Sequence, residues 1–298
     1  MLPIDHNAKV LMLDNSAVET FTICPRKALY SIMGQRRSAR PQAALRFGGH
    51  LHAALAYRYR CEALDLPWSE GTQMRILDRR FCSTPCEDEE WRNLGTAQKV
   101  ISKYNLHWSR DPINIISVGG FPLVEKPFAV FAGEVSGWQV YATGRIDLAH
   151  RTDGIIVRDH KTTSMLGDSY WRDAASSAQQ RGYLWALRTI LGEEPLGYEI
   201  NVLATRAPTK TGTPIEFARR TYYTRGQLDE WHSNFLAKAE YFLWLLARQQ
   251  WPRHEAMHCV HKYGTCEFYQ VCELPVSQRE AMLASTEYTN NTWTPLYK

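Results

Sequence analysis

Apolar and β-branched residues are concentrated in about five segments of the chain, which we predict to be β-strands. These segments lie near residues 122–131, 138–148, 155–162, 198–205 and 216–223. Apolar residues recur with helical spacing from Leu45 to Tyr59, near residues 173–191 and from Leu228 to Gln249. The last helix carries an apolar stripe formed by Trp231, Phe235, Phe242, Leu245 and Leu246. Such spacing predicts burial, so we expect an α/β fold with helices packed on strands.

The size of the chain is sufficient for a substantial core. It has 298 residues, of which 44% are hydrophobic. We expect a single domain over residues 1–298, with residues 60–110 as a mainly helical insertion. Ser16 to Glu19 fits a capping box at the start of a short helix, and Pro25 suits the first turn of the next helix.

A β-hairpin is predicted around residues 152–154, between two of the expected strands. Opposite residues of an antiparallel pair share a face, so the length of the loop decides which side chains meet. A two-residue loop would place Asp147 opposite His160, whereas a three-residue loop would place it opposite Asp159. We predict the three-residue loop, or a bulge of equal effect, with Gly154 at a positive φ angle.

The net charge says little about partners. The formal value is +4, which alone does not indicate nucleic-acid binding. Basic residues form two clusters, and such clusters are usually solvated surface unless they contact phosphates. The clusters are Arg36, Arg37 and Arg40, and then Arg206, Lys210, Arg219 and Arg220.

The first residues show no secretory signal, because no basic segment precedes an apolar one. No uninterrupted apolar run of about 18 residues is present, so we expect no membrane span and a cytoplasmic location. The chain has seven cysteines, and in such a compartment metal ligation or free thiols are expected rather than disulfides.

Carboxylates and a lysine follow one another in the centre of the chain. Gly144 to Asp147 is followed by Asp159 to Lys161, and then by Gln179 and Tyr183 on a predicted helix. Two carboxylates and one lysine suit phosphodiester hydrolysis, because the anions hold a hard divalent cation and the ammonium offsets negative charge. An isolated Asp-x-Lys element is more often an ordinary strand end with exposed charges, so the ordered set carries the prediction.

In this order the motifs resemble the RecB-like branch of the PD-(D/E)XK nuclease superfamily. The segment Phe47 to Leu55 resembles the Gly-x-x-x-His-x-x-Leu helix of that family, with His52 as the matching histidine. His50 has no role in the pattern and would point elsewhere on the helix. The resemblance implies a restriction-endonuclease-like core, with a central mixed β-sheet flanked by helices, plus the helical insertion.

The resemblance also implies a metal site. His52, Asp147 and Asp159 would hold Mg²⁺ or Mn²⁺, with the backbone carbonyl of His160 as a further ligand. Glu125, on the preceding predicted strand, is another candidate.

The remaining catalytic roles follow from the same resemblance. Lys161 would help to activate water and would offset charge at the scissile phosphate. Gln179 and Tyr183 are four residues apart, so they share one helical face, from which they would orient Lys161, water or a DNA strand.

A second constellation consists of Cys24 and three C-terminal cysteines, Cys259, Cys266 and Cys272. Four thiolates suffice for one [4Fe–4S] cluster, while Zn²⁺ and buried free thiols are the alternatives. Cys24 to Lys27 resembles the N-terminal motif of the iron–sulfur members of the branch, such as AddB-type subunits and CRISPR-associated nucleases. The six-residue gap between Cys259 and Cys266 departs from the common two-residue gap, and the intervening Lys262 to Gly264 would form a turn.

We expect the cluster to be a structural staple. It would pair region 250–275 with Cys24 and thereby tie the two ends of the chain together. Three other cysteines match no position of the family and are expected to be free thiols. These are Cys61, Cys82 and Cys86.

The expected function is that of a Mg/Mn-dependent deoxyribonuclease, an exonuclease acting on DNA that is single-stranded or has free ends. Recombination, repair or phage DNA processing would be its setting. One alternative is a CRISPR-adaptation nuclease that trims spacer precursors. Another is a weakly active DNA-binding subunit of a helicase–nuclease complex. The sequence has no Gly-x-x-x-x-Gly-Lys-Ser/Thr phosphate loop, so a helicase or recombination partner protein would supply any motor.

Overall fold

The computed structural model describes residues 4–39, 43–86, 91–109, 113–163, 166–205, 218–254, 258–261 and 264–292. The chain divides into two compact units, each assembled from segments that are distant in the sequence. The first, which we call the site unit, contains Pro41–Lys126 and Arg145–Leu228. The second, the cysteine unit, contains Met1–Arg40, Pro127–Gly144 and Asp229–Lys298.

A mixed β-sheet forms the centre of the site unit. Its strands are, in order, the second half of β8 (Trp138–Arg151), β9 (Ile155–Thr163), β10 (Gly197–Ala204) and β11 (Ala218–Tyr222), with β4 (Asn114–Ile115) paired to β8. β9 is antiparallel to β8 and parallel to β10, and β11 is antiparallel to β10. Strands β8 to β11 lie where the hydrophobic pattern predicts them, whereas β4 was not predicted. A small hairpin, β5 (Ser117–Val118) with β6 (Phe121–Pro122), precedes β7.

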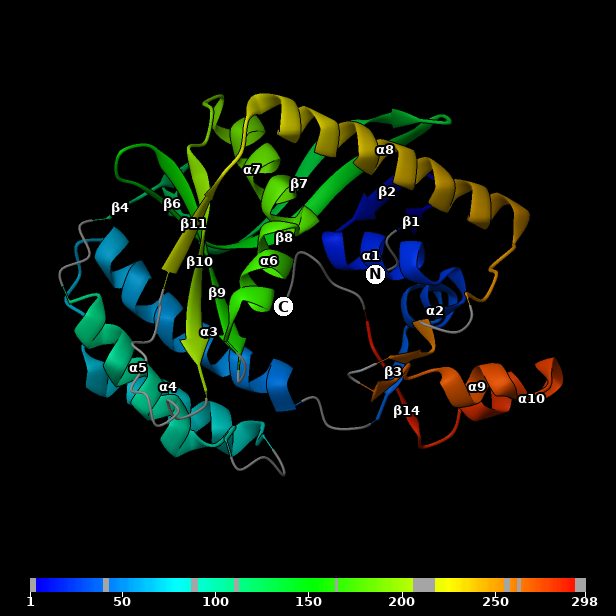
Figure 1. The fold of residues 1–298 in the computed structure, drawn as a ribbon, viewed down its shortest axis with the longest axis horizontal. Coiled ribbons are helices and arrows are strands. Elements are labelled where there is room, and N and C mark those ends of the chain that lie inside the picture. Colours follow the sequence, from blue (N-terminus) through cyan, green and yellow to red (C-terminus); the bar gives the residue numbers. More distant parts are fainter. Residues whose placement is uncertain are drawn as a thin grey trace. The chain divides into compact units, whose positions relative to one another are not determined.

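Helices flank this sheet, as Figure 1 shows. They are α3 (Ala43–Ala63), α4 (Glu70–Ser83), α5 (Leu94–His107), α6 (Asp168–Ala175) and α7 (Ala178–Leu191). α3 packs on β9 and α5 on β10, while α4 packs on both of these helices. α7 also packs on β10, and alternate residues of β9 face α5 and α7, so these helices cover opposite faces. The predicted α/β fold with a central mixed sheet flanked by helices is therefore confirmed.

Residues 60–110 contain the helices α4 and α5 and contribute to the core. Ile101 and Tyr104 of α5 are fully buried, in one cluster with Phe47 and Leu148. Because α5 lies on the sheet, this region supports the fold of the site unit directly.

The hairpin between β8 and β9 has the predicted three-residue loop. Leu148 pairs with Arg158, and the pairing runs up to a loop formed by residues 152–154. Continued by one pair, this register sets Asp147 opposite Asp159, so both carboxylates belong to one face of the sheet.

The predicted backbone conformation of Gly154 is wrong, since its φ angle is not positive. A Cβ atom at this position would lie only 2.8 Å from the Cβ atom of Leu196. Glycine is therefore required here by a close approach between two segments and not by the turn itself.

Two predicted helix boundaries differ from the structure. α1 (Asn15–Ile23) is capped by Asp14, whose side chain accepts a hydrogen bond from the Ala17 amide at 2.6 Å, so the capping box at Ser16 is wrong. The helix predicted near residues 173–191 is two helices, α6 and α7. Ser177 begins the second one, because its side chain accepts from the Gln179 amide.

In the cysteine unit, the first half of β8 pairs in parallel with β2 (Val10–Leu13), which pairs with β1 (Ile4–Asp5). β7 (Val124–Val135) also pairs with β8. The predicted long helix is α8 (Arg225–Arg248), and all five residues of its apolar stripe are buried. The smaller elements are α2 (Pro25–Ala28, with Pro25 in its predicted first turn), a π-helical turn (Leu29–Met33), β3 (Arg36–Ser38), β12 (Val260–His261), β13 (Gly264–Thr265), α9 (Tyr269–Glu273), α10 (Val276–Leu283) and β14 (Tyr288–Asn290).

Candidate active site

Three side chains of the site unit converge from different elements: His52 from α3, Glu125 from the start of β7 and Asp147 from β8. The Nδ1 atom of His52 lies 2.9 Å from Oε1 of Glu125 and 3.5 Å from Oδ2 of Asp147. One ligand atom from each residue lies within 4.8 Å of the others. Two carboxylates and one imidazole are donors that hold divalent cations, so this group suits a metal ion.

The orientation of His52 is fixed by the backbone of β9. Its Nε2 atom lies 2.8 Å from the carbonyl oxygen of His160 and must donate to it, since a carbonyl can only accept. Its Nδ1 atom therefore faces the carboxylates. Burial lowers the pKa of His52, but Asp147 and Glu125 more than compensate and raise the pKa to about 9. The carbonyl oxygen of His160 was predicted to be a further metal ligand. Metal binding there would compete with this hydrogen bond for the same oxygen.

Asp147 and Asp159 occupy neighbouring positions with different partners. Oδ2 of Asp147 accepts a hydrogen bond from the His160 amide at 2.9 Å. Asp159 is not one of the three converging residues; its carboxylate lies 2.9 Å from Nζ of Lys161. Burial raises the pKa of Asp159 to about 6, although the charge of Lys161 opposes the rise.

Gln179 and Tyr183 of α7 both face this part of the sheet, as their four-residue spacing predicts. Oε1 of Gln179 lies 3.5 Å from Nζ of Lys161. The Tyr183 hydroxyl accepts a hydrogen bond from the Arg145 amide at 3.4 Å, and burial raises the pKa of Tyr183 to about 12. α7 thus contacts both the lysine and the strand that carries Asp147.

Glu125 is the residue that the sequence indicated least clearly. Its φ angle is +48°, in the left-handed region that non-glycine residues rarely adopt, at a cost on the order of 1–3 kcal/mol. In this conformation, Oε1 of Glu125 contacts His52, and Oε2 lies 3.7 Å from Nη1 of Arg145. No motif surrounds Glu125, so its position on the strand before β8 was the only signal in the sequence.

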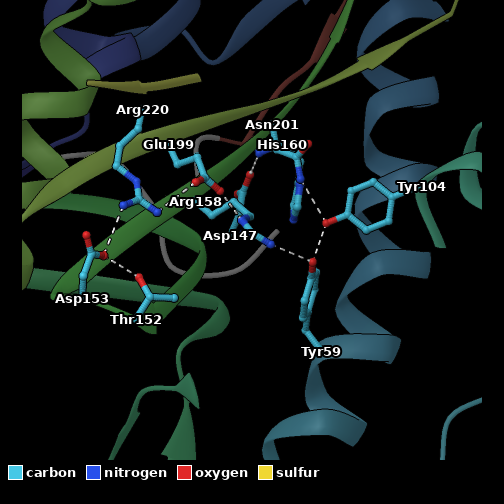
Figure 2. Close-up of polar contacts among 10 residues, drawn as sticks. All are labelled: Tyr59, Tyr104, Asp147, Thr152, Asp153, Arg158, His160, Glu199, Asn201 and Arg220. Carbon is cyan, nitrogen blue, oxygen red and sulfur yellow. Dashed lines mark hydrogen bonds and ion pairs between the residues drawn. The ribbon is translucent and has the colours of Figure 1, made fainter. Parts of the chain in front are cut away.

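A buried polar network lies behind the site (Figure 2). Arg158 donates to Oε1 of Glu199 at 2.5 Å and to the Tyr59 hydroxyl at 3.1 Å. The hydroxyls of Tyr59 and Tyr104 are hydrogen-bonded to each other, and the His160 ring stacks on Tyr59. These contacts join α3 and α5 to β9, so they fix the helix that carries the histidine of the site.

Other features that the sequence singled out are not among these residues. His50 points elsewhere, as predicted, with Nε2 2.8 Å from the carbonyl of Thr84. Arg36 donates to the side chain of Asn290. Several residues of the basic clusters and of the predicted cysteine turn lie outside the described residues. These are Arg40, Arg206, Lys210, Lys262 and Tyr263.

The cysteine unit contains Cys24, Cys259, Cys266 and Cys272. Cys24 and Cys259 are buried, and the Cys266 amide donates to the Cys259 carbonyl at 2.8 Å. Burial raises the pKa of the Cys266 and Cys272 thiols, and the nearby Cys24 adds to both shifts. Within the described residues, no three of these Sγ atoms lie within 4.8 Å of one another.

Comparison with known proteins identifies the class. The model of the PD-(D/E)XK nuclease superfamily matches residues 15–273, so the chain belongs to this superfamily. A provisionally named exonuclease from Eubacterium rectale has a similar fold, with a TM-score of 0.53 at 13% identity over 94% of this chain and 95% of that one.

Two further solved structures show weaker similarity. SSO0001 matches with a TM-score of 0.36 at 13% identity, over 78% of this chain and 76% of that one. LHK-Exo in complex with dAMP matches with a TM-score of 0.27 at 12% identity, over 68% of this chain and 95% of that one. The search of curated proteins gave no match. Within the described part of the chain, no helix has the length and apolar character that crossing a membrane requires.

Proposed function

We propose that the chain is a metal-dependent deoxyribonuclease of the RecB-like branch, an exonuclease acting on DNA that is single-stranded or has free ends. The observation that carries this proposal is that three possible metal ligands lie next to a carboxylate–lysine pair. His52, Glu125 and Asp147 converge at a distance that suits a metal ion, and Asp159 with Lys161 lies next to them on β9. Recombination, repair or phage DNA processing is the setting we assign to it.

The donor set fits Mg²⁺ or Mn²⁺. Carboxylate oxygens suit both ions, and a single imidazole is compatible with Mn²⁺ in particular. The hydrogen bond from Nε2 of His52 to the His160 carbonyl leaves Nδ1 as the ligand atom, in the arrangement by which proteins orient metal-binding histidines. A bound ion of this kind lowers the pKa of water and stabilises negative charge on a phosphate.

The residues around this group position the substrate and the nucleophile. Asp159 accepts hydrogen bonds from an attacking water and adds a further carboxylate beside Glu125 and Asp147. Lys161 places its ammonium where negative charge develops on the scissile phosphate. Gln179 orients Lys161, and Tyr183 holds the backbone of β8 two residues before Asp147.

We also propose that the four cysteines of the cysteine unit ligate a [4Fe–4S] cluster. The burial of Cys24 and Cys259 and the proximity of Cys24 to Cys266 and Cys272 support this proposal, with Zn²⁺ as the alternative. Anaerobic purification followed by iron, sulfide and zinc analysis tests this. Four irons and four sulfides per chain are expected, and one zinc without iron would refute the cluster.

Cleavage of end-labelled single-stranded and double-stranded DNA tests the nuclease proposal. We expect cleavage that requires Mg²⁺ or Mn²⁺ and falls at least about a hundredfold in Asp159→Ala and Lys161→Ala, because each removes a group that acts on the transition state. Lys103→Ala, which removes an exposed lysine of α5, is the matched control. Unchanged activity in both site variants would reject the mechanism.

A further inference from the structure

A cavity opens between α6 and the strands β10 and β11. Its volume is about 550 Å³, in the range of pockets that hold a small ligand. Its lining includes Asp168, Trp171 and Arg172 of α6, Ile200 of β10, and Arg219 and Thr221 of β11. Among the described residues that line it, two arginines and one aspartate give the cavity a polar lining with a net positive charge.

The register of the sheet connects this cavity to the candidate active site. Ile200 is the partner of Asp159 in the parallel pair of β9 and β10, and Arg219 is the partner of Ile200 in the next pair. Paired residues share a face, and neighbouring strands lie about 4.8 Å apart. Arg219 therefore lies on the same face as Asp159, on the order of 10 Å away across two strand spacings.

The two adjacent arginines of β11 have different environments. Arg220 lies 3.4 Å from Oε2 of Glu199 and 3.2 Å from Oδ1 of Asp153, on the face of the sheet that carries the buried network (Figure 2). Arg219 is on the opposite face of the sheet. Its guanidinium carbon, Cζ, lies over the ring of Trp171, 4.4 Å from the ring centroid. Trp171 is only 6% exposed, so it forms a rigid base beneath an exposed guanidinium.

A guanidinium whose plane is held by a buried indole is suited to bind phosphate oxygens in pairs. We propose that this cavity is a phosphate-binding subsite, in which Arg219 and Arg172 bind the backbone of a DNA strand at the nucleotide next to the one being cut. This inference rests on the proposed nuclease function and extends it to a second contact with the same strand. Trp171 is a positioning residue, because it acts through Arg219.

Equilibrium binding of a fluorescent single-stranded oligonucleotide, measured in EDTA over a range of salt concentrations, tests the subsite without requiring catalysis. Arg219→Gln should weaken binding about tenfold, as expected for one charged contact. It should also reduce the slope of log Kd against log salt by about 0.7, the value for one phosphate of a single strand. Arg219→Lys should keep the slope but recover only part of the affinity, because lysine lacks the planar stack on Trp171.

The matched control is Arg225→Gln, which removes an exposed arginine at the start of α8, outside the cavity. We expect it to leave the salt slope unchanged. An unchanged slope in Arg219→Gln, or an equal decrease in Arg225→Gln, would overturn the subsite. If the wild-type protein cleaves DNA with metal but the variants give either of these results, the nuclease proposal survives and the subsite does not. If the Arg219 effect is seen in a protein that never cleaves, the subsite survives and the nuclease proposal fails.

Discussion

Individual residues of the site were predictable to different degrees. Asp147, Asp159 and Lys161 were candidates because their residue types suit phosphodiester hydrolysis and their order resembles the motif order of the superfamily. Glu125 was indicated only weakly, as a candidate on the preceding strand, since its place in the group depends on a left-handed backbone and on contact with His52, which is 73 positions away. Neither a strained φ angle nor a distant contact leaves a local trace in a sequence.

His150 gives a prediction at this scale. It is fully buried in β8, and no hydrogen-bond partner for its ring is found among the described residues. Burial, together with Arg158 and Arg220, lowers the pKa of His150 to about 3. The folded protein therefore keeps it neutral while the unfolded chain binds a proton below about pH 6.5, so stability falls as the pH falls from about 6.5 towards 3.

Replacement of His150 by leucine should remove this effect. Denaturant unfolding between pH 7 and pH 4.5 should show a pH dependence that is flatter than in wild type by up to about 1.4 kcal/mol per pH unit. His6→Gln, which replaces an exposed histidine, serves as the control. An equal dependence of unfolding free energy on pH in His150→Leu and wild type would contradict the conclusion that buried His150 stays neutral.

At the scale of elements, strands β8 to β11 and the helices α3 and α8 were predictable because their apolar residues repeat with a clear period. β2 was missed, since it is only four residues long and pairs with a strand that is more than a hundred positions later. The break between α6 and α7 was also missed, because serine competes for backbone hydrogen bonds through its side chain rather than through hydrophobic spacing.

The network behind the site predicts unequal effects for two arginines. Arg158 is 2% exposed and pairs with Glu199, whereas Arg151 forms an exposed pair with Glu193. Arg158→Met should lower the free energy of unfolding by about 3 kcal/mol, because the buried Glu199 carboxylate then keeps only its longer contact with Arg220. Arg151→Gln should cost less than about 1 kcal/mol.

Denaturant unfolding of both variants measures this difference. Addition of Glu199→Gln to Arg158→Met should recover part of the loss, because the buried charge that has lost its closer partner is then removed. Similar costs for the two arginine variants would show that the network does not hold the helices to the sheet.

At the scale of the whole molecule, each of the two units is assembled from distant segments. The cysteine unit contains both ends of the chain, and Cys24 is brought near Cys266 and Cys272 there. In the sequence, only the cysteines indicated that these segments lie close together, since Cys24 is more than two hundred positions from Cys266 and Cys272. The site unit, in contrast, is organised by the local β8–β9 hairpin, which explains why its geometry was easier to predict.

Cys24→Ser should therefore destabilise the protein if the four thiols share a cluster. We expect loss of iron and a decrease in unfolding free energy of at least about 2 kcal/mol, because metal binding contributes to folding. Cys82→Ser, at an exposed cysteine of the site unit, should change neither property. Thermal unfolding with iron analysis on the same samples tests this, and full iron content in Cys24→Ser would contradict it.

The most direct test of a divalent-metal nuclease centre at His52, Glu125, Asp147 and Lys161 is the rate of DNA cleavage as a function of Mg²⁺ concentration. Glu125→Gln should raise the Mg²⁺ concentration for half-maximal rate at least about tenfold, because it weakens a ligand. Lys161→Ala should lower the rate at saturating Mg²⁺ at least about a hundredfold with little change in that concentration. Glu134→Gln, at an exposed position of β7, should resemble wild type. Cleavage that does not depend on Mg²⁺, or that is unaffected by both site variants, would contradict the assignment of this centre.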